Sequence, residues 1–305
     1  MNSASVRSWR PVGAAIGIVL DQCLGEPSTP RHPLVHFGRL MSTLERQNYR
    51  DSRVRGSGFA LVGTFVGVAS GRILGSTAAA TYVAVGARML ADTATDVHRA
   101  LAKDDLEGAR ALMPSLVGRD PSALDAIEMT RATVESVAEN TVDAVVAPVL
   151  WAAFLGAPGA LGYRALNTLD AMVGHRSARY VRYGWASARL DDVANWFPAR
   201  ATAVLVTAVR PHSAARIYTA LRDQAPAHPS PNAGVAEAAF AAALGIELGG
   251  RNRYGERIED RPALGTGRRP EPSDIARAVR LSRDVTFALA TLLVVVGVAS
   301  WRSAR

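Results

Sequence analysis

The sequence predicts an all-α fold, a polytopic helical membrane protein with large cytoplasmic helical loops. Three observations predict it. Residues 285–301 carry no charge, residues 56–91 are apolar except for two arginines, and residues 144–163 are apolar but interrupted by proline and glycine. The chain has 305 residues, of which 49% are hydrophobic. This composition lies between a soluble enzyme and a membrane protein, so the local stretches decide the class.

The first element is an apolar helix near residues 12–24. Arg7 and Arg10 lie before or at its start, which gives the outline of a signal peptide. No small-x-small cleavage site follows, because the apolar run ends at Asp21 and the stiff segment 25–27. We therefore expect an uncleaved, membrane-associated helix.

The second apolar segment, 56–91, has Arg72 near its middle and predicts a helical hairpin. Each arm is short for a span, since about 20 residues are needed to cross roughly 30 Å of hydrocarbon. Four glycines recur at every fourth position: Gly63, Gly67, Gly71 and Gly75. They stack on one helical face, where another helix can approach closely, although scatter in a glycine-rich chain is the alternative. If Arg72 marks the turn, that face keeps only the first three.

Three later segments complete the membrane base. Residues 144–163 contain Pro148 and the run Gly156-Ala-Pro-Gly159, which predicts a broken or re-entrant helix rather than a straight span. Residues 199–210 are too short to cross alone. Residues 285–301 predict a C-terminal span at the lower limit of length.

The distribution of arginine along the chain determines the predicted membrane topology. Basic residues fill four segments: 31–55, 88–131, 164–200 and 210–283. The positive-inside rule places all four on the cytoplasmic side of the inner membrane, provided that the apolar segments between them enter and return as hairpins. We therefore expect a single membrane domain over residues 1–305. Its catalytic loops, 92–143, 164–198 and 211–284, form one cytoplasmic assembly.

The net charge of +8 comes almost entirely from arginine, because Lys103 is the only lysine. A basic balance favours nucleic acid, anionic lipid or phosphorylated substrates. The chain lacks RNA-binding and zinc-finger patterns, so we expect membrane lipid and no nucleic acid as a partner. The single cysteine, Cys23, excludes an internal disulfide framework. The absence of a P-loop, a Rossmann fingerprint and a G-x-S-x-G elbow, and the lone lysine, argue against the usual nucleotide, hydrolase and pyridoxal phosphate sites.

The first polar cluster lies on a helix predicted over residues 124–146. Its charged residues follow spacings of three and four, so they share an arc of roughly 120°. They are Glu128, Arg131, Glu135, Glu139 and Asp143. The stripe, with Asn140, runs into the apolar segment that begins at Ala144, where carboxylates are costly unless they are paired or metal-bound. A surface helix with ordinary salt bridges is the alternative.

Three more polar clusters have the same character. They comprise Arg164, Asn167, Asp170 and His175; then Arg189, Asp191, Asp192 and Asn195; and then Ser230, Asn232 and Glu237. Ion pairs at helix ends would explain the first two. In the third, Ser230 as an N-cap, with Pro231 at the first helical position and Gly245 at the end, is the simpler account. Together the clusters offer oxygen ligands and arginines, a set that suits magnesium and phosphate better than zinc or iron.

These residues belong to an ordered series of motifs. The series is Asp21-x-x-x-Gly25-Glu26-Pro27 with His32-Pro33, Gly118-Arg119-Asp120, Glu135-Ser-Val-Ala-Glu139-Asn140-Thr-Val-Asp143, Tyr163-Arg-Ala-Leu-Asn167-Thr-Leu-Asp170, Ala188-Arg-Leu-Asp191-Asp192 and Ser230-Pro-Asn-Ala-Gly234. In this order, over roughly residues 12 to 285, the series resembles the CobD/CbiB family of cobalamin biosynthesis, a family of integral membrane proteins. Each motif alone is weak, whereas the ordered set is highly specific.

The resemblance implies a ligase that forms an amide at the expense of ATP. It would join adenosylcobyric acid to (R)-1-amino-2-propanol or its O-phosphate, giving adenosylcobinamide or its phosphate. The corrinoid is a substrate and not a cofactor, ATP is a co-substrate, and Mg²⁺ accompanies it. Other membrane-bound late enzymes of vitamin B12 synthesis are further candidate partners. The residues do not distinguish aminopropanol from its phosphate.

The predicted site follows from this chemistry, since a carboxylate becomes an acyl donor once its oxygen is phosphorylated. Catalysis is assigned to Glu135, Glu139, Asp143, Asp170 and Asp192, and metal binding to Glu135, Asn140, Asp143 and Asp191. Substrate and phosphate binding is assigned to Arg131, Arg164, Asn167, His175, Arg189, Asn195, Ser230, Asn232 and Glu237. A corrinoid transporter and a noncatalytic membrane sensor are the alternatives. The first requires an inverted repeat, which we do not find, and the second leaves the carboxylate motifs without a purpose.

Overall fold

The computed structural model describes residues 9–26, 32–118, 121–122, 124–254 and 257–303. This part of the chain is helical except for one two-stranded hairpin, which confirms the predicted all-α class. The chain divides into two compact units. Unit 1 comprises residues 1–86, 143–197 and 289–305, and unit 2 comprises residues 87–142 and 198–288. This division is finer than the single membrane domain expected from the sequence.

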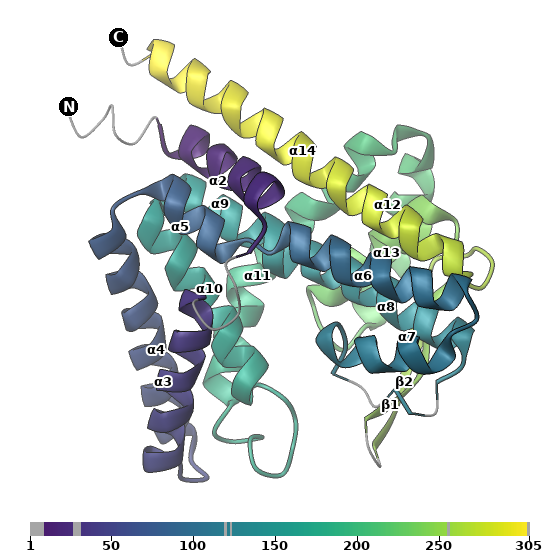
Figure 1. The fold of residues 1–305 in the computed structure, drawn as a ribbon, viewed down its shortest axis with the longest axis horizontal. Coiled ribbons are helices and arrows are strands. Elements are labelled where there is room, and N and C mark those ends of the chain that lie inside the picture. The colour runs from purple at the N-terminus through teal and green to yellow at the C-terminus, as the bar shows by residue number, and fades with distance from the viewer. Residues whose placement is uncertain (1–8, 27–31, 119–120, 123, 255–256, 304–305) are drawn as a thin grey trace. The chain divides into compact units, whose positions relative to one another are not determined.

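Unit 1 is an assembly of helices. Those that lie wholly within it are α2 (Arg10–Leu24), α3 (Pro33–Asn48), α4 (Arg53–Leu74), α5 (Thr77–Ala84), α9 (Ala147–Leu155) and α10 (Ala157–Val173). The first part of α11 (Trp185–Val209) and the last part of α14 (Pro272–Ser303) also belong to it. α4 packs against α3 and, more extensively, against α10 (Figure 1).

Close packing of α4 on α10 explains the repeated glycines. A Cβ added at Gly67 would lie 2.6 Å from the Ala165 Cβ, and one at Gly71 would lie 2.6 Å from the carbonyl carbon of Ala157. Both distances are far shorter than a carbon–carbon contact, so only glycine lets the helices approach this closely. Gly75 does not join this face, because it ends α4 in the left-handed conformation, with φ 68°.

The predicted hairpin over residues 56–91 is wrong. Arg72 does not mark a turn; it lies in the last turn of α4, which runs for 22 residues. At 1.5 Å per residue α4 is about 33 Å long, enough to cross the hydrocarbon layer. The chain breaks instead after Gly75, where the Ser76 hydroxyl accepts a hydrogen bond from the Ala79 N–H and so begins α5. With only 8 residues, α5 is too short to be a returning span.

Three helices in the described residues are long and apolar enough to cross a membrane: Arg53–Leu74, Ala126–Leu155 and Pro272–Ser303. The predicted C-terminal span is therefore part of a longer helix. The predicted break within residues 144–163 is confirmed, because Gly156, with φ 73°, separates α9 from α10. α2 and α11, which contain the predicted segments 12–24 and 199–210, are not among the three.

The outward side of α4 is apolar. Leu61, Phe65 and Ile73 are 65%, 72% and 88% exposed in the isolated chain. A continuous apolar face of this kind is costly in water and favourable in lipid, at roughly 25 cal/mol per Å² of apolar surface removed from water. The face therefore fits a helix whose surroundings are acyl chains.

We expect the protein to fractionate with the membrane and to resist both alkaline carbonate and high salt. Salt screens attraction between arginines and lipid headgroups, but it does not release helices that are buried in hydrocarbon. The measurement is an immunoblot of pellet and supernatant after each wash. Release by salt alone would mean that charge attraction, rather than insertion of α4 and α14, holds the protein on the membrane.

Unit 2 is built around α13 (Ala233–Leu244), whose residues are nearly all buried. Their small side chains let α8 (Ala126–Thr141) and α12 (Ala214–Asp223) pack closely on α13. The other helices wholly within the unit are α6 (Ala87–Ala102) and α7 (Leu106–Leu112). α13 ends at Gly245 as predicted, but it begins at Ala233, so Pro231 lies outside the helix and is not at its first position.

A β-hairpin in unit 2 departs from the sequence-based expectation. β1 (Leu248–Tyr254) pairs antiparallel with β2 (Arg257–Leu264), and the register shifts between Leu248 and Gly250. Gly249 lies at this bulge with φ 86°, a conformation that favours glycine. The bulge turns the Gly249 N–H out of the ladder and toward a side chain of α8.

The helix predicted over residues 124–146 begins with a capping box. Asp125 and Glu128 each bond the other's backbone N–H, so Glu128 caps α8 and does not serve the acidic stripe. After Thr141 the helix passes through a π-helical turn, Val142–Val146, before α9 begins. A π turn holds one residue more than an α turn, so it changes the face on which the following residues lie.

Candidate functional site

The side-chain amide of Asn167 joins carboxylates from two other elements of unit 1. Its Nδ2 lies 3.4 Å from Asp143 Oδ2 and 3.4 Å from Asp191 Oδ1, and donates to both. Asn167 is on α10, Asp191 is on α11, and Asp143 is in the π turn before α9. Three helical segments therefore meet at one amide nitrogen.

Two more side chains complete this group, which we call the unit-1 polar cluster: Asp143, Tyr163, Asn167, Asp191 and Asn195. Asn195 Nδ2 donates to Asp191 Oδ2 at 3.0 Å, from one turn further along α11. Asn195 Oδ1 accepts a hydrogen bond from the Tyr163 hydroxyl at 2.8 Å. Amide groups thus hold both oxygens of Asp191, which fixes the orientation of its carboxylate.

Asp143 lies within the π turn that links α8 to α9. Its carboxylate accepts a hydrogen bond from Asn167 of α10. The last residue of the acidic stripe predicted from sequence spacing therefore bonds to a different helix.

Arg164 connects the cluster to the segment that follows α2. Its Nη1 donates to Asn167 Oδ1 at 3.2 Å, and its charge acts on Glu26 and His32. Burial raises the pKa of Glu26; Arg164 opposes this effect and Asp21 reinforces it. Burial, and secondly Arg164, lower the pKa of His32. The imidazole is therefore neutral at pH 7, and its 4.0 Å contact with Glu26 is not an ion pair at that pH.

Asp21, Glu26 and His32 were not among the residues assigned to the site from the sequence. The signal for them is the first motif, Asp21-x-x-x-Gly25-Glu26 followed by His32, in which a carboxylate pair and an imidazole flank a helix end. His32 also begins α3, because its Nδ1 accepts a hydrogen bond from the Leu34 N–H. Pro27, Arg119 and Asp120 of the motifs lie outside the described residues.

Two of the carboxylates assigned to magnesium from the sequence, Asp143 and Asp191, lie in the unit-1 polar cluster. No group of three or more histidine, cysteine, aspartate or glutamate side chains that could hold a metal ion occurs in the described part of the chain. Mg²⁺ is usually held by one or two carboxylates, with phosphate and water oxygens in the remaining positions. Asp143 and Asp191 supply such a pair. Asn140, also predicted as a ligand, instead donates to the Ser136 carbonyl on its own helix at 2.9 Å.

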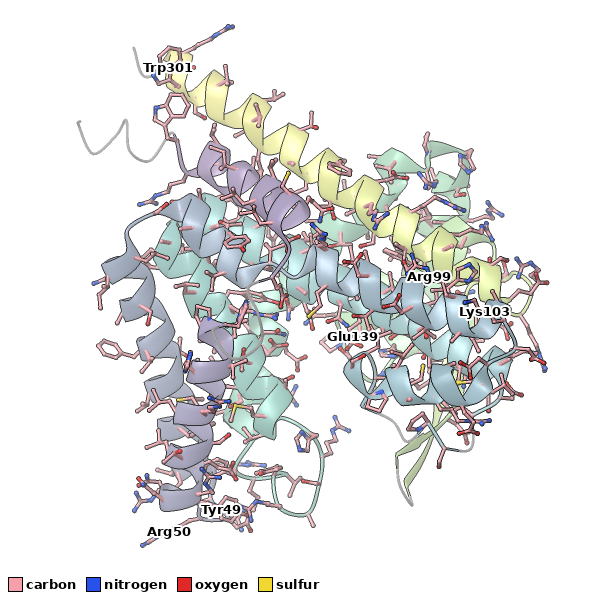
Figure 2. The ribbon with its side chains drawn as sticks, viewed as in Figure 1. Tyr49, Arg50, Arg99, Lys103, Glu139 and Trp301 are labelled. Carbon is pink, nitrogen blue, oxygen red and sulfur yellow. The ribbon has the colours of Figure 1, made fainter. Side chains whose placement is uncertain are left out.

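In unit 2 a small cavity lies beside α8. It has a volume of about 70 Å³ and is lined by residues that include Glu135, Glu139, Ser136 and Arg261. Glu135 is only 2% exposed, and its Oε1 accepts a hydrogen bond from the Gly249 N–H at 2.9 Å. Glu139 is exposed one turn later (Figure 2). The hairpin therefore closes over Glu135 and leaves Glu139 accessible.

A second charged group of unit 2 surrounds Glu237, which is fully buried on α13. Its Oε1 lies 3.8 Å from His228 Nε2 and 3.6 Å from the Arg261 guanidinium. Asn232 Oδ1 accepts a hydrogen bond from Arg200 at 3.3 Å. Sequence reasoning missed Arg200, His228 and Arg261, because their proximity to Glu237 or Asn232 arises from the packing of α11, α13 and the hairpin.

The third polar motif has a structural role as well. The Ser230 hydroxyl accepts hydrogen bonds from the N–H groups of Asn232 and Ala233, so it caps the approach to α13. These are the two N–H groups that an N-cap at Ser230 would bond, although the helix itself is assigned from Ala233.

The remaining predicted residues lie at the edges of these groups. On α10 Asp170 is partly buried one turn beyond Asn167. Asp192 pairs with the exposed Arg189 at 3.4 Å, and burial raises the pKa of Asp192 while Arg189 and Arg176 oppose that shift. The ring of His175 packs edge-on against Tyr180, 5.1 Å away. Arg131 lies beside the Gly250 backbone. The predicted residues thus lie in groups within each of the two units.

The sequence profile described as CobD/Cbib protein matches residues 14–282, most of the chain. The chain belongs to the CobD/CbiB family. This family assignment, predicted from the motifs, is confirmed, and the motifs of the CobD/CbiB family supply Asn167, Asp191 and Asp143 of the unit-1 polar cluster.

The names of similar proteins agree with this assignment. The chain is 50% identical over 304 positions to the "Cobalamin biosynthesis protein CobD" of Mycobacterium bovis, covering 95% of this chain and 97% of that protein. Proteins of the same name from Chromobacterium violaceum and Rhodobacter capsulatus are 45% and 39% identical, over 87% and 92% of this chain and 90% and 95% of their own lengths. No solved structure matches the chain.

Proposed function

We propose that this chain is an enzyme of cobalamin biosynthesis that joins adenosylcobyric acid to (R)-1-amino-2-propanol, or to its O-phosphate, by ATP-dependent amide formation. Membership of the CobD/CbiB family and the names of its relatives support the pathway. The observation that carries the chemistry is the convergence of Asp143 and Asp191 on Asn167, with Arg164 bonded to the same amide.

The reaction needs an activated carboxyl group. A propionate oxygen of the corrinoid attacks the γ-phosphoryl group of ATP, and ADP leaves. The amine nitrogen then attacks the acyl carbon, phosphate leaves, and the ammonium proton passes to a base. One of the carboxylates assigned to catalysis from the sequence would accept that proton.

The unit-1 polar cluster would serve the phosphoryl step. Asp143 and Asp191 would hold Mg²⁺, which neutralises charge on the phosphates when it is bound. Asn167 and Asn195 hold the two carboxylates in place through their amide hydrogen bonds. Arg164, fixed by Asn167, would face the anionic phosphoryl oxygens and offset their charge in the transition state.

Location follows from the same proposal. If ATP and the corrinoid reach the enzyme from the cytoplasm, the unit-1 polar cluster would face the cytoplasm from the inner membrane. Association with other membrane-bound late enzymes of the pathway also remains a proposal.

The decisive experiment is an assay of the detergent-purified protein with adenosylcobyric acid and each amine, with and without Mg-ATP. We expect a corrinoid product whose mass corresponds to amide formation, together with one ADP per amide, only when ATP is present. Running both amines in parallel identifies the donor. Amide formation without ATP would exclude the phosphoryl route, and no product with either amine would exclude the proposed reaction.

A further inference from the structure

One end of unit 1 carries a concentration of arginine that the proposed reaction does not use. The segments 39–55 and 174–185 contain eight arginines but only two acidic residues, Glu45 and Asp51. The two segments lie together, because the Tyr49 hydroxyl donates to the Arg179 carbonyl at 2.7 Å. Figure 2 shows Tyr49 and Arg50 at this end of α3.

Aromatic rings hold part of this surface in place. The Arg179 guanidinium lies 4.0 Å from the centre of the Tyr49 ring and 5.4 Å from that of Tyr180, and it pairs with Glu45 at 3.0 Å. The Arg53 guanidinium lies 5.4 Å from the Trp185 ring. Glu45 is thereby satisfied within the fold, and the surrounding arginines face solvent with little compensating charge.

We call four exposed arginines around the start of α4 the arginine platform: Arg50, Arg53, Arg55 and Arg182. Asp51 lies 3.6 Å from Arg182, and this pair is more than half exposed on both sides. An ion pair so exposed to water is weak, so Asp51 neither neutralises nor buries Arg182. The platform therefore keeps most of its positive charge.

The position of the platform along α4 indicates its partner. α4 is a candidate span that begins at Arg53, and its apolar outward face starts beside the platform at Val54, which is 81% exposed. Arginine next to tyrosine and tryptophan at the end of an apolar helix is the pattern of a membrane–water interface. A ligand that lies across this boundary needs an anionic head and apolar chains.

We propose that the arginine platform binds the headgroups of anionic phospholipids, whose acyl chains lie along the exposed face of α4. Arginine donates two parallel hydrogen bonds to a phosphate, and several such residues at one level of the membrane bind several headgroups. A soluble phosphate compound could satisfy the arginines, but it would leave the adjoining apolar face of α4 uncovered. The continuity of charge and apolar surface therefore favours lipid.

The test uses the full-length protein in nanodiscs of phosphatidylcholine with a rising fraction of phosphatidylglycerol. The variant is Arg50→Gln with Arg182→Gln. The matched control is Arg99→Gln with Arg222→Gln, two exposed arginines of unit 2 on helices that are not candidate spans. Native mass spectrometry counts the phosphatidylglycerol retained after release, and the unfolding temperature is measured in each lipid.

Retention of phosphatidylglycerol should fall by about fivefold for each platform arginine removed, and should be unchanged in the control. Added sodium chloride should weaken retention by the wild type more than by the platform variant. Equal unfolding temperatures in pure phosphatidylcholine would show that the variant is folded. If the glutamine variant unfolds at a lower temperature than the wild type, the variant Arg50→Lys with Arg182→Lys is used in its place. This lysine variant keeps both positive charges and should retain the lipid.

Two results would overturn the proposal. One is equal retention of phosphatidylglycerol by the platform variant and the control. The other is displacement of the lipid by inorganic phosphate at matched charge concentration, which would make the platform a site for soluble anions. Neither result bears on amide formation, because the assay with adenosylcobyric acid is scored separately.

Discussion

Asp191→Asn is expected to lower turnover by about 100- to 1000-fold while leaving the fold intact. The substitution keeps the size of the side chain and one of the two acceptor oxygens that Asn167 and Asn195 bond, but removes the negative charge, so the unfolding temperature is measured beside turnover. Charge neutralisation at a phosphoryl-transfer site is worth several kcal/mol, which sets this range. Asp143→Asn should behave in the same way, because its carboxylate meets the same amide.

The measurement is the rate of ADP and amide release by each variant as the magnesium concentration rises. If Asp143 and Asp191 share an ion, more magnesium should partly restore the weaker variant. Asp96→Asn is the matched control, since Asp96 is an exposed carboxylate that pairs with Arg99 on the surface of α6 (Figure 2). It should retain full activity. Wild-type turnover in Asp191→Asn would reduce the cluster to a structural network.

A large loss of stability is expected from Gly71→Ala. Its new Cβ would lie 2.6 Å from the carbonyl carbon of Ala157 and 2.6 Å from the Pro158 Cα, both of them backbone atoms that cannot rotate away. α4 and α10 would have to separate, at a cost of about 3 kcal/mol or more. We expect a markedly lower unfolding temperature in detergent and a poor yield of monodisperse protein.

Gly58→Ala is the matched control for this change. Gly58 is on the same helix, but nothing lies within 4 Å of the position that its Cβ would take. Alanine favours a helix over glycine by about 1 kcal/mol, so this variant should be as stable as the wild type or more stable. If both variants unfold at the same temperature, the close approach of α4 to α10 is not what the glycines provide.

Local patterns were sufficient to predict the class of the fold and the glycine face. Apolar length predicted the helices, and four-residue spacing predicted the close approach at Gly63, Gly67 and Gly71. The same pattern failed at Arg72, because one charge near the end of a long apolar helix is tolerated when the side chain faces outward. The true boundary between α4 and α5 lies at Ser76, whose hydroxyl accepts a hydrogen bond from the Ala79 N–H. A single serine is only a weak sequence signal for the start of a helix.

The sequence predicted which residues belong to the candidate site, but not how they are arranged in space. Asn167 and Asp191 lie in motifs, so they were named in advance. Their meeting with Asp143 depends on a π turn, which has no signature in the spacing of charges. Tertiary packing brings His228 and Arg261 to Glu237, and Arg200 to Asn232. The sequence of the hairpin that carries Arg261 is highly charged and predicts a loop. A periodic pattern in the sequence cannot predict such tertiary contacts.

The π turn at Val142–Val146 makes the number of residues in this helix as important as their identity. Loss of one residue there would let the helix return to α-helical geometry without changing the chemistry of any side chain that remains. The flanking helical segments would keep their faces, because an α turn closes with one residue fewer than a π turn, whereas the residues within the turn would change theirs. A deletion next to Asp143 would therefore move its carboxylate relative to Asn167. Insertions and deletions should therefore be excluded from this segment more strictly than substitutions of its valines.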